Sequence, residues 1–106
     1  MVETKREAGL PLFLAERYVS SANPELAYLD AARASAASKE QAEGGTTVRY
    51  LGSTLIPSDE TCFALFEAPS AEDVRRLLER AWLPYDRIVE AVRIGAEETD
   101  KEEEKR

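Results

Sequence analysis

One continuous stretch, residues 50–92, constrains the fold of this chain more than any other part. Two β-prone runs are separated by a short turn, and a capped amphipathic pattern and a third β-prone run follow them. This order predicts strand, turn, strand, helix, loop and strand. Because the local signals agree at each step, the stretch specifies an arrangement of elements far better than it specifies a reaction.

The first part of this stretch completes a predicted β-hairpin. Residues 46–56 and 61–67 are rich in the branched and aromatic side chains that strands favour. Between them, Pro57 stands at the second position of a turn, where its fixed backbone angle fits. We therefore expect two antiparallel neighbours in one sheet.

The second part predicts a helix and a last strand. Ser70 and Asp73 have the spacing of a helix cap, with Asp in place of the usual Glu. Apolar residues then recur at i, i+3, i+4 and i+7, namely Val74, Leu77, Leu78 and Ala81. Pro84 limits the helix, because the residue before a proline is driven out of helical geometry. Residues 88–94 form the last predicted strand.

The chain before residue 46 predicts one more strand and one more helix. Residues 10–19 are apolar on both faces, which indicates a central strand. Asn23 is the expected N-cap of a helix over residues 25–43, and Pro24 is its first residue. The face expected to pack on the sheet consists of Leu26, Leu29, Ala32 and Ala36.

The predicted order is βαββαβ, which is the α+β, ferredoxin-like plait: a four-stranded antiparallel sheet with two helices on one face. We expect one domain at residues 10–95, because 106 residues with 43% hydrophobic content can form one modest core. Residues 1–9 and the acidic tail at 96–106 lack an apolar pattern. We predict that both are disordered.

Charge and composition exclude several classes of function. A net charge of −7 opposes binding to nucleic acid or to an anionic membrane, because both favour clustered Lys and Arg. No apolar run approaches the roughly 20 residues that span a bilayer. The first residues lack the apolar segment of a secretory signal. We therefore expect a cytoplasmic protein.

Metal and thiol chemistry are also disfavoured by the composition. The chain contains no histidine, and Cys62 is its only cysteine, so neither an imidazole site nor a Cys-based zinc site can form. Cys62 has no histidine to activate it and is expected to be a buried structural thiol. We predict no metal site and no cofactor.

Alternation along the central strands divides their side chains between two faces. One face carries Phe13, Ala15, Ala64 and Phe66. The other face carries Leu12, Leu14, Glu16, Phe63, Leu65 and Glu67. Both faces are largely apolar, but two helices can cover only one of them. We expect a second copy of the chain to cover the other face and form a homodimer, because large apolar patches are rare on monomers.

Two carboxylates mark a candidate site on that open face. Glu16 and Glu67 are expected at equivalent ends of neighbouring parallel strands, where they could approach each other. Such a pair would raise the pKa of one carboxyl group, or bind a cation or an arginine. The alternative is that each carboxylate forms a separate ion pair at the rim of the sheet, with Arg17, Arg49, Arg87 or Arg93.

Tyrosine hydroxyls complete the candidate site, because aromatic side chains with polar tips orient small ligands. The predicted ligand-binding residues are Glu16, Tyr50, Glu67 and Tyr85, and the predicted ligand is a small molecule. The alternative is that these tyrosines, with Tyr18 and Trp82, anchor the core or a dimer interface.

Three strings in the chain resemble one known family. Residues 12–18 (LFLAERY), 59–70 (DETCFALFEAPS) and 83–88 (LPYDRI) are similar to the domain-of-unknown-function family 4242, and the similarity covers about residues 10–94. The resemblance implies a small ferredoxin-like protein that forms dimers, and one branch is associated with nickel. Nickel in that branch implies imidazole ligands. Since this chain has no imidazole, the resemblance assigns nickel binding to no residue here.

Three classes of function remain. The first, which we expect, is a dimeric domain that binds a small ligand without a transition metal. The second is a cofactor-independent enzyme of the dimeric α+β-barrel type, with Glu16 or Glu67 as base and Tyr50 or Tyr85 as proton donor. The third is a structural domain that binds a partner. The fold accommodates all three.

Overall fold

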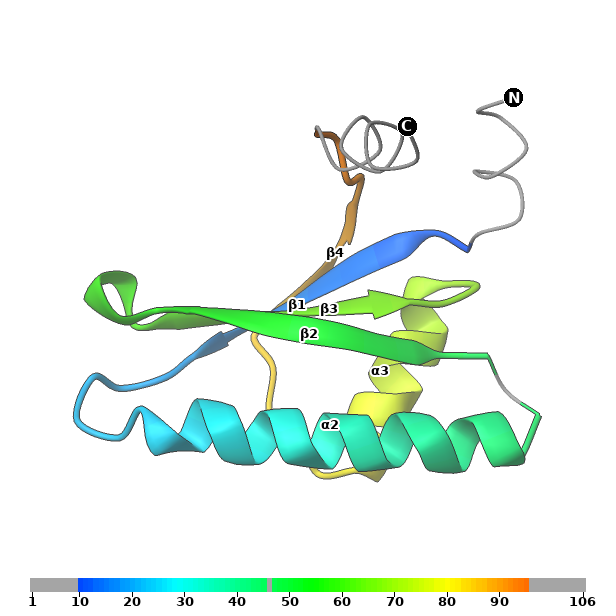
Figure 1. Cartoon of the computed structure of the whole chain (residues 1–106), viewed down its shortest axis with the longest axis horizontal. Coiled ribbons are helices and arrows are strands. Elements are labelled where there is room, and N and C mark those ends of the chain that lie inside the picture. Colours follow the sequence, from blue (N-terminus) through cyan, green and yellow to red (C-terminus); the bar gives the residue numbers. More distant parts are fainter. Residues whose placement is uncertain (1–9, 46, 96–106) are drawn as a thin grey trace, which may run out of the picture.

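The computed structural model describes residues 10–45 and 47–95 of the chain. Its elements are β1 (Leu12–Tyr18), α2 (Glu25–Glu43), β2 (Arg49–Ile56), β3 (Thr61–Glu67), α3 (Ala71–Arg80) and β4 (Arg87–Ala91). The strands form one antiparallel sheet in the order β2-β3-β1-β4, and both helices lie on the same side of it (Figure 1). The predicted α+β, ferredoxin-like plait is confirmed. The disorder predicted at 1–9 and 96–106 concerns residues outside those that the structure describes.

The strand directions correct one prediction. The expectation that the first and third strands run parallel is wrong, because β1 is antiparallel to β3, with Leu12 opposite Glu67 and Glu16 opposite Phe63. The physical reason is the connectivity. A crossover through α2 returns the chain so that β2 runs in the direction of β1, and the tight turn then reverses β3.

Burial confirms the predicted division of the sheet faces. Phe13 and Ala15 of β1 and Phe66 of β3 are buried beneath the helices, and Ala64 packs against the same cluster. The helix α3 contributes Val74, Leu77 and Leu78, which are at most 3% exposed. The predicted periodicity of this helix is therefore confirmed, and the core lies between its apolar face and the sheet.

The expected packing face of α2 is only partly correct, because Leu26 is partly buried and packs against the core but the other three residues of that face are exposed. Ala27 and Ala34 are the buried residues of this helix, whereas Leu29 is 54% exposed, and Ala32 and Ala36 are exposed as well. Alanine occurs on several sides of the helix, so the difference in hydrophobicity between its faces is small. Tertiary contacts, rather than the apolar pattern, select the face that packs.

The two helix starts differ in how they are capped. Ser70 accepts a hydrogen bond from the backbone N–H of Asp73 at 3.2 Å, which confirms the predicted cap of α3. The predicted cap of α2 is wrong: Pro24 is its N-cap and makes no side-chain capping bond. Asn23 contributes only its backbone carbonyl, which accepts from Leu26 N at 3.2 Å.

Neither described helix combines the length and apolar character needed to cross a membrane.

Candidate functional site

The two candidate carboxylates lie at opposite ends of the sheet. The β1–β3 register places Glu67 opposite Leu12, four residues from Glu16 and so about 13 Å away along the strand. They do not form the shared carboxylate site that the sequence suggested, because antiparallel neighbours bring opposite strand ends together.

Each of these carboxylates instead has its own arginine. Glu16 Oε2 accepts a hydrogen bond from Arg87 Nη2 at 2.9 Å, and Glu67 Oε1 accepts one from Arg49 Nη1 at 2.8 Å. The hydrogen bond and the negative charge of Glu16 raise the pKa of Arg87 above its ordinary value. The alternative of separate ion pairs at the rim is therefore the arrangement observed.

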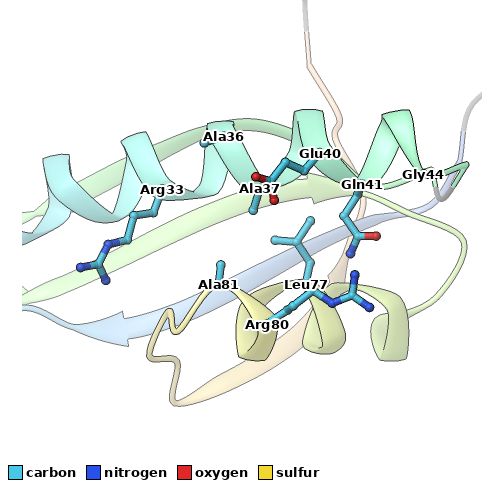
Figure 2. Close-up of a pocket in the computed structure, with 9 residues that line it drawn as sticks. All are labelled: Arg33, Ala36, Ala37, Glu40, Gln41, Gly44, Leu77, Arg80 and Ala81. Carbon is cyan, nitrogen blue, oxygen red and sulfur yellow. The ribbon is translucent and has the colours of Figure 1, made fainter.

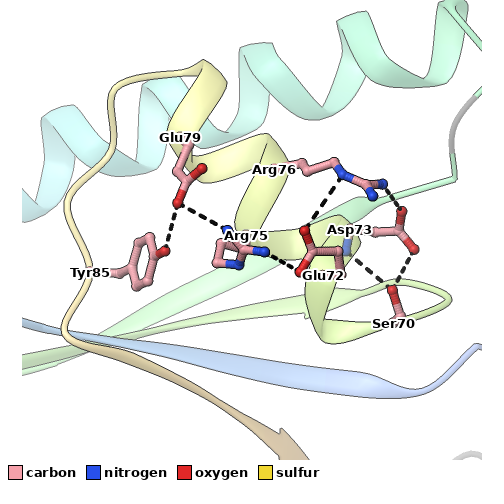
Figure 3. Close-up of polar contacts among 7 residues, drawn as sticks. All are labelled: Ser70, Glu72, Asp73, Arg75, Arg76, Glu79 and Tyr85. Atoms are coloured by element: carbon pink, nitrogen blue, oxygen red, sulfur yellow. Dashed lines mark hydrogen bonds and ion pairs between the residues drawn. The ribbon is translucent and has the colours of Figure 1, made fainter.

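The two candidate tyrosines lie away from these carboxylates. Tyr50 packs on the helix-covered side, with its ring centre 5.4 Å from that of Phe66 and its hydroxyl 2.5 Å from Ser53 Oγ. Tyr85 donates a hydrogen bond to Glu79 Oε2 of α3 at 3.0 Å (Figure 3). Partial desolvation and this bond raise the pKa of the Tyr85 phenol. The four predicted residues thus do not converge within one chain.

The open sheet face carries a row of partly buried apolar side chains. Leu14 lies opposite Leu65 on one side and Val89 on the other, and Leu12 and Phe63 extend the row. The Glu16–Arg87 and Glu67–Arg49 pairs flank this row at its two ends. Directly opposed residues share a face of an antiparallel sheet, so these apolar side chains form one surface.

A groove of about 590 Å³ separates α2 from α3 (Figure 2). Its lining consists of Arg33, Ala36, Ala37, Glu40, Gln41, Gly44, Leu77, Arg80 and Ala81. Arg33 lies toward one end of the groove, and Arg80 extends toward Gln41 at the other end (Figure 2). Small alanines between them leave the space open, and the buried Leu77 lies beneath it.

Arg33 and Arg80 differ from most other arginines of the described chain. Arginines at positions 17, 49, 75, 76 and 87 form ion pairs with carboxylates. Within residues 10–45 and 47–95, Arg33 and Arg80 have neither an ion pair nor a side-chain hydrogen bond. The groove therefore contains two guanidinium groups whose five donors each are free for another partner.

The outer face of α3 has no such free charges. Arg75 pairs with Glu72 and, at 3.4 Å, with Glu79, while Arg76 lies 3.4 Å from Asp73 and 3.7 Å from Glu72 (Figure 3). These residues are three or four positions apart, the spacing at which opposite charges support a helix. This network is a stabilising surface, and it ends before Arg80.

Sequence reasoning missed the groove between the helices. One signal was present: positions 33, 37, 40, 41 and 44 recur at helical spacing along one side of α2. The contribution of α3 could not be found in the same way, because it depends on how the two helices sit on the sheet.

The described part of the chain offers few side chains that could act together as metal ligands. Within the described part of the chain, no group of three or more Cys, Asp or Glu side chains could hold a metal ion, and the full sequence has no histidine. Burial, followed by the charge of Asp30, raises the pKa of the Cys62 thiol, which favours the protonated form over the thiolate that metals bind.

Comparison with known families gives one informative match. A family model described as "Nickel responsive protein SCO4226-like" matches residues 13–91, which is most of the chain and nearly all of the described fold. Comparisons with curated proteins and with solved structures find no match.

Proposed function

The chain belongs to the SCO4226-like nickel responsive protein family, and we propose that this member is a homodimeric domain that binds a small anionic ligand in the α2–α3 groove without a transition metal. The observation that carries the proposal is the pair of arginines in that groove. Among the described residues, neither Arg33 nor Arg80 forms an ion pair or a side-chain hydrogen bond, although Arg33 also attracts the Asp30 carboxylate.

The composition of the groove favours a particular kind of anion. Ala36, Ala37 and Ala81 suit an apolar body, and Gln41 offers an amide close to the Arg80 end. Glu40 and the carbonyl-rich C-terminal ends of both helices oppose negative charge, so a ligand with a single small anionic group fits better than a highly charged one. The net charge of −7 likewise repels long polyanions.

The nickel named in the family description does not suit the donors of this chain. Nickel is well matched by imidazole, which is absent, and the one thiol is buried with a raised pKa. The described carboxylates do not gather in a group of three. We therefore assign nickel no role in ligand binding here.

The open sheet face supports the dimer part of the proposal. Leu12, Leu14, Phe63, Leu65 and Val89 form an apolar surface between two charged ends, and both helices lie on the opposite side of the sheet. A second copy of the chain supplies a matching apolar row and matching charged ends, as a two-fold interface requires. Burial of this row would remove apolar area from water in both copies.

The enzyme alternative receives less support from the same geometry. It requires a carboxylate base and a tyrosine donor in one cleft. Glu16 and Glu67 are separated along the sheet, each is paired with an arginine, and Tyr50 lies on the other face. A cytoplasmic location remains a prediction from composition.

Hexanoate is a suitable probe, because it combines one carboxylate with a short apolar body. We expect hexanoate, and not hexanol, to shift the amide resonances of Arg33, Ala37, Gln41 and Ala81 in a saturable manner. Hexanoate has one carboxylate and the two arginines lie at opposite ends of the groove, so Arg80→Gln, at the end that also offers the Gln41 amide, should weaken this binding several-fold, and Arg33→Gln should weaken it less. Arg76→Gln removes a charge from the outer face of α3, the helix that carries Arg80, and should leave hexanoate binding unchanged. Equal loss in all three variants would indicate a general charge effect and contradict the proposal.

A further inference from the structure

A second concave surface lies between α2 and the edge strand β2. This α2–β2 groove has a volume of about 450 Å³, and its lining includes Ala27, Ala31, Tyr28, Tyr50, Leu55 and Pro57. The two alanines of α2 are small enough to leave space beside the sheet, and two tyrosines supply aromatic surface. Tyr28 is 75% exposed, so the groove is open to solvent.

A smaller cavity lies next to this groove. Ser53 and Cys62 line both the groove and an inner cavity of about 30 Å³, which also borders Arg17 and Asp30. This inner space holds one group about the size of a water molecule. Ser53 and Cys62 are therefore common to both spaces. The inner cavity is otherwise lined mainly by apolar side chains, and Arg17 and Asp30 form its polar end.

The polar end has unused hydrogen-bonding capacity. Arg17 Nε is buried against Asp30 Oδ2 at 2.7 Å, whereas Arg17 Nη2 and Asp30 Oδ1 have no hydrogen bond among the described residues. Burial of a donor or an acceptor without a partner is unfavourable. A group that enters the inner cavity meets a cationic donor from β1 and an anionic acceptor from α2.

These neighbours discriminate among polar groups. A carboxylate would be repelled by Asp30, and an ammonium group would be repelled by Arg17. A hydroxyl both donates and accepts, carries no charge and has the size of the inner cavity. The aromatic lining of the groove favours a ring as the body of the ligand.

We propose that the α2–β2 groove binds a small phenol, with its ring beside Tyr28 and Tyr50 and its hydroxyl directed past Ser53 and Cys62 toward the Arg17–Asp30 pair. This site is separate from the α2–α3 groove and does not depend on the function proposed for it. It uses different side chains of α2 and a neutral ligand.

The test compares p-cresol with toluene, which has the same ring and methyl group but no hydroxyl. In heteronuclear NMR titrations of the full chain, p-cresol should shift the amide resonances of Ala31, Ser53 and Cys62 in a saturable manner. Toluene should bind at least roughly tenfold more weakly than p-cresol, because it has no hydroxyl to satisfy the polar end.

Two matched variants locate the site. Ala31→Leu fills the α2–β2 groove and should abolish p-cresol binding, whereas Ala36→Leu places the same side chain in the α2–α3 groove and should preserve it. Thermal melts establish that both variants fold, and if Ala31→Leu does not fold, the milder Ala31→Val takes its place. Equal affinity for p-cresol and toluene, the absence of saturable p-cresol binding, or loss of binding in Ala36→Leu alone would each overturn the proposal.

Discussion

Arg17 of β1 and Asp30 of α2 form a partly buried ion pair of 2.7 Å that joins the sheet to the longer helix. Their side chains are 19% and 21% exposed, so both charges lose much of their hydration. Since the alanines of α2 select its packing face only weakly, this pair is a specific contact that favours the observed rotation of the helix.

The ionisation of Asp30 should affect stability in a defined direction. Burial raises the pKa of Asp30 above its ordinary value, and this effect exceeds the opposing effects of Arg17 and Arg33. The folded state then binds the proton more tightly than the unfolded state. The contribution of Asp30 to stability is therefore present at low pH and is lost as pH rises from the unfolded pKa through the folded pKa.

Urea unfolding of the wild type and Asp30→Asn across the acidic range tests this. As pH falls, the free energy of unfolding of the wild type should rise relative to that of the variant. If the free energy of unfolding of the wild type instead falls relative to that of Asp30→Asn as pH falls, attraction to Arg17 outweighs desolvation.

Two leucines at contrasting positions test the assigned helix faces. Leu77 of α3 is 0% exposed, so Leu77→Ala should lower the free energy of unfolding by about 2–5 kcal/mol. Leu29 of α2 is 54% exposed, and Leu29→Ala should change it by only about 0.5 kcal/mol. Chemical unfolding measures both, and similar losses would mean that α2 packs through the face expected from the sequence.

The two helix caps provide a second comparison. Ser70 caps α3 through its hydroxyl, so Ser70→Ala should lower stability by about 1 kcal/mol. Ser70→Thr keeps a hydroxyl and should recover part of this loss. Asn23→Ala should have little effect, because the side chain of Asn23 makes no capping bond to α2. Unfolding midpoints that rank Asn23→Ala as the more harmful change would contradict this assignment.

The open sheet face predicts a specific pattern of association. The wild-type chain should sediment as a dimer at micromolar concentration, and Leu14→Glu should shift it to a monomer by placing a charge at the centre of the apolar row. Leu29→Glu introduces the same charge on an exposed helix position and should remain dimeric. A wild-type monomer of normal stability would require another explanation for the apolar face.

Elements specified by local signals were predicted better than features that depend on contacts between distant residues. Residues 61–67 and the cap and periodicity of α3 were predicted well, because strand alternation, Ser70 and the spacing of Leu77 and Leu78 are local signals. The last strand was predicted too long, since regular pairing with β1 ends at Ala91.

The candidate site was predicted less well, because it depends on tertiary geometry. An error in strand direction moved Glu67 from beside Glu16 to the opposite end of the sheet. The arginines of the α2–α3 groove come from separate helices, and nothing in the local sequence places Arg33 and Arg80 along one surface. Their lack of ion pairs could be recognised only after every described carboxylate had been placed.

Calorimetric titration of hexanoate into protein stripped of metal on a chelating resin tests the proposed function most directly. The wild type and an Arg33→Gln, Arg80→Gln double variant would be compared. We predict saturable binding to the metal-free wild type and none to the double variant, with added nickel changing neither result. Binding that requires nickel, or that persists after both arginines are replaced, would contradict the account.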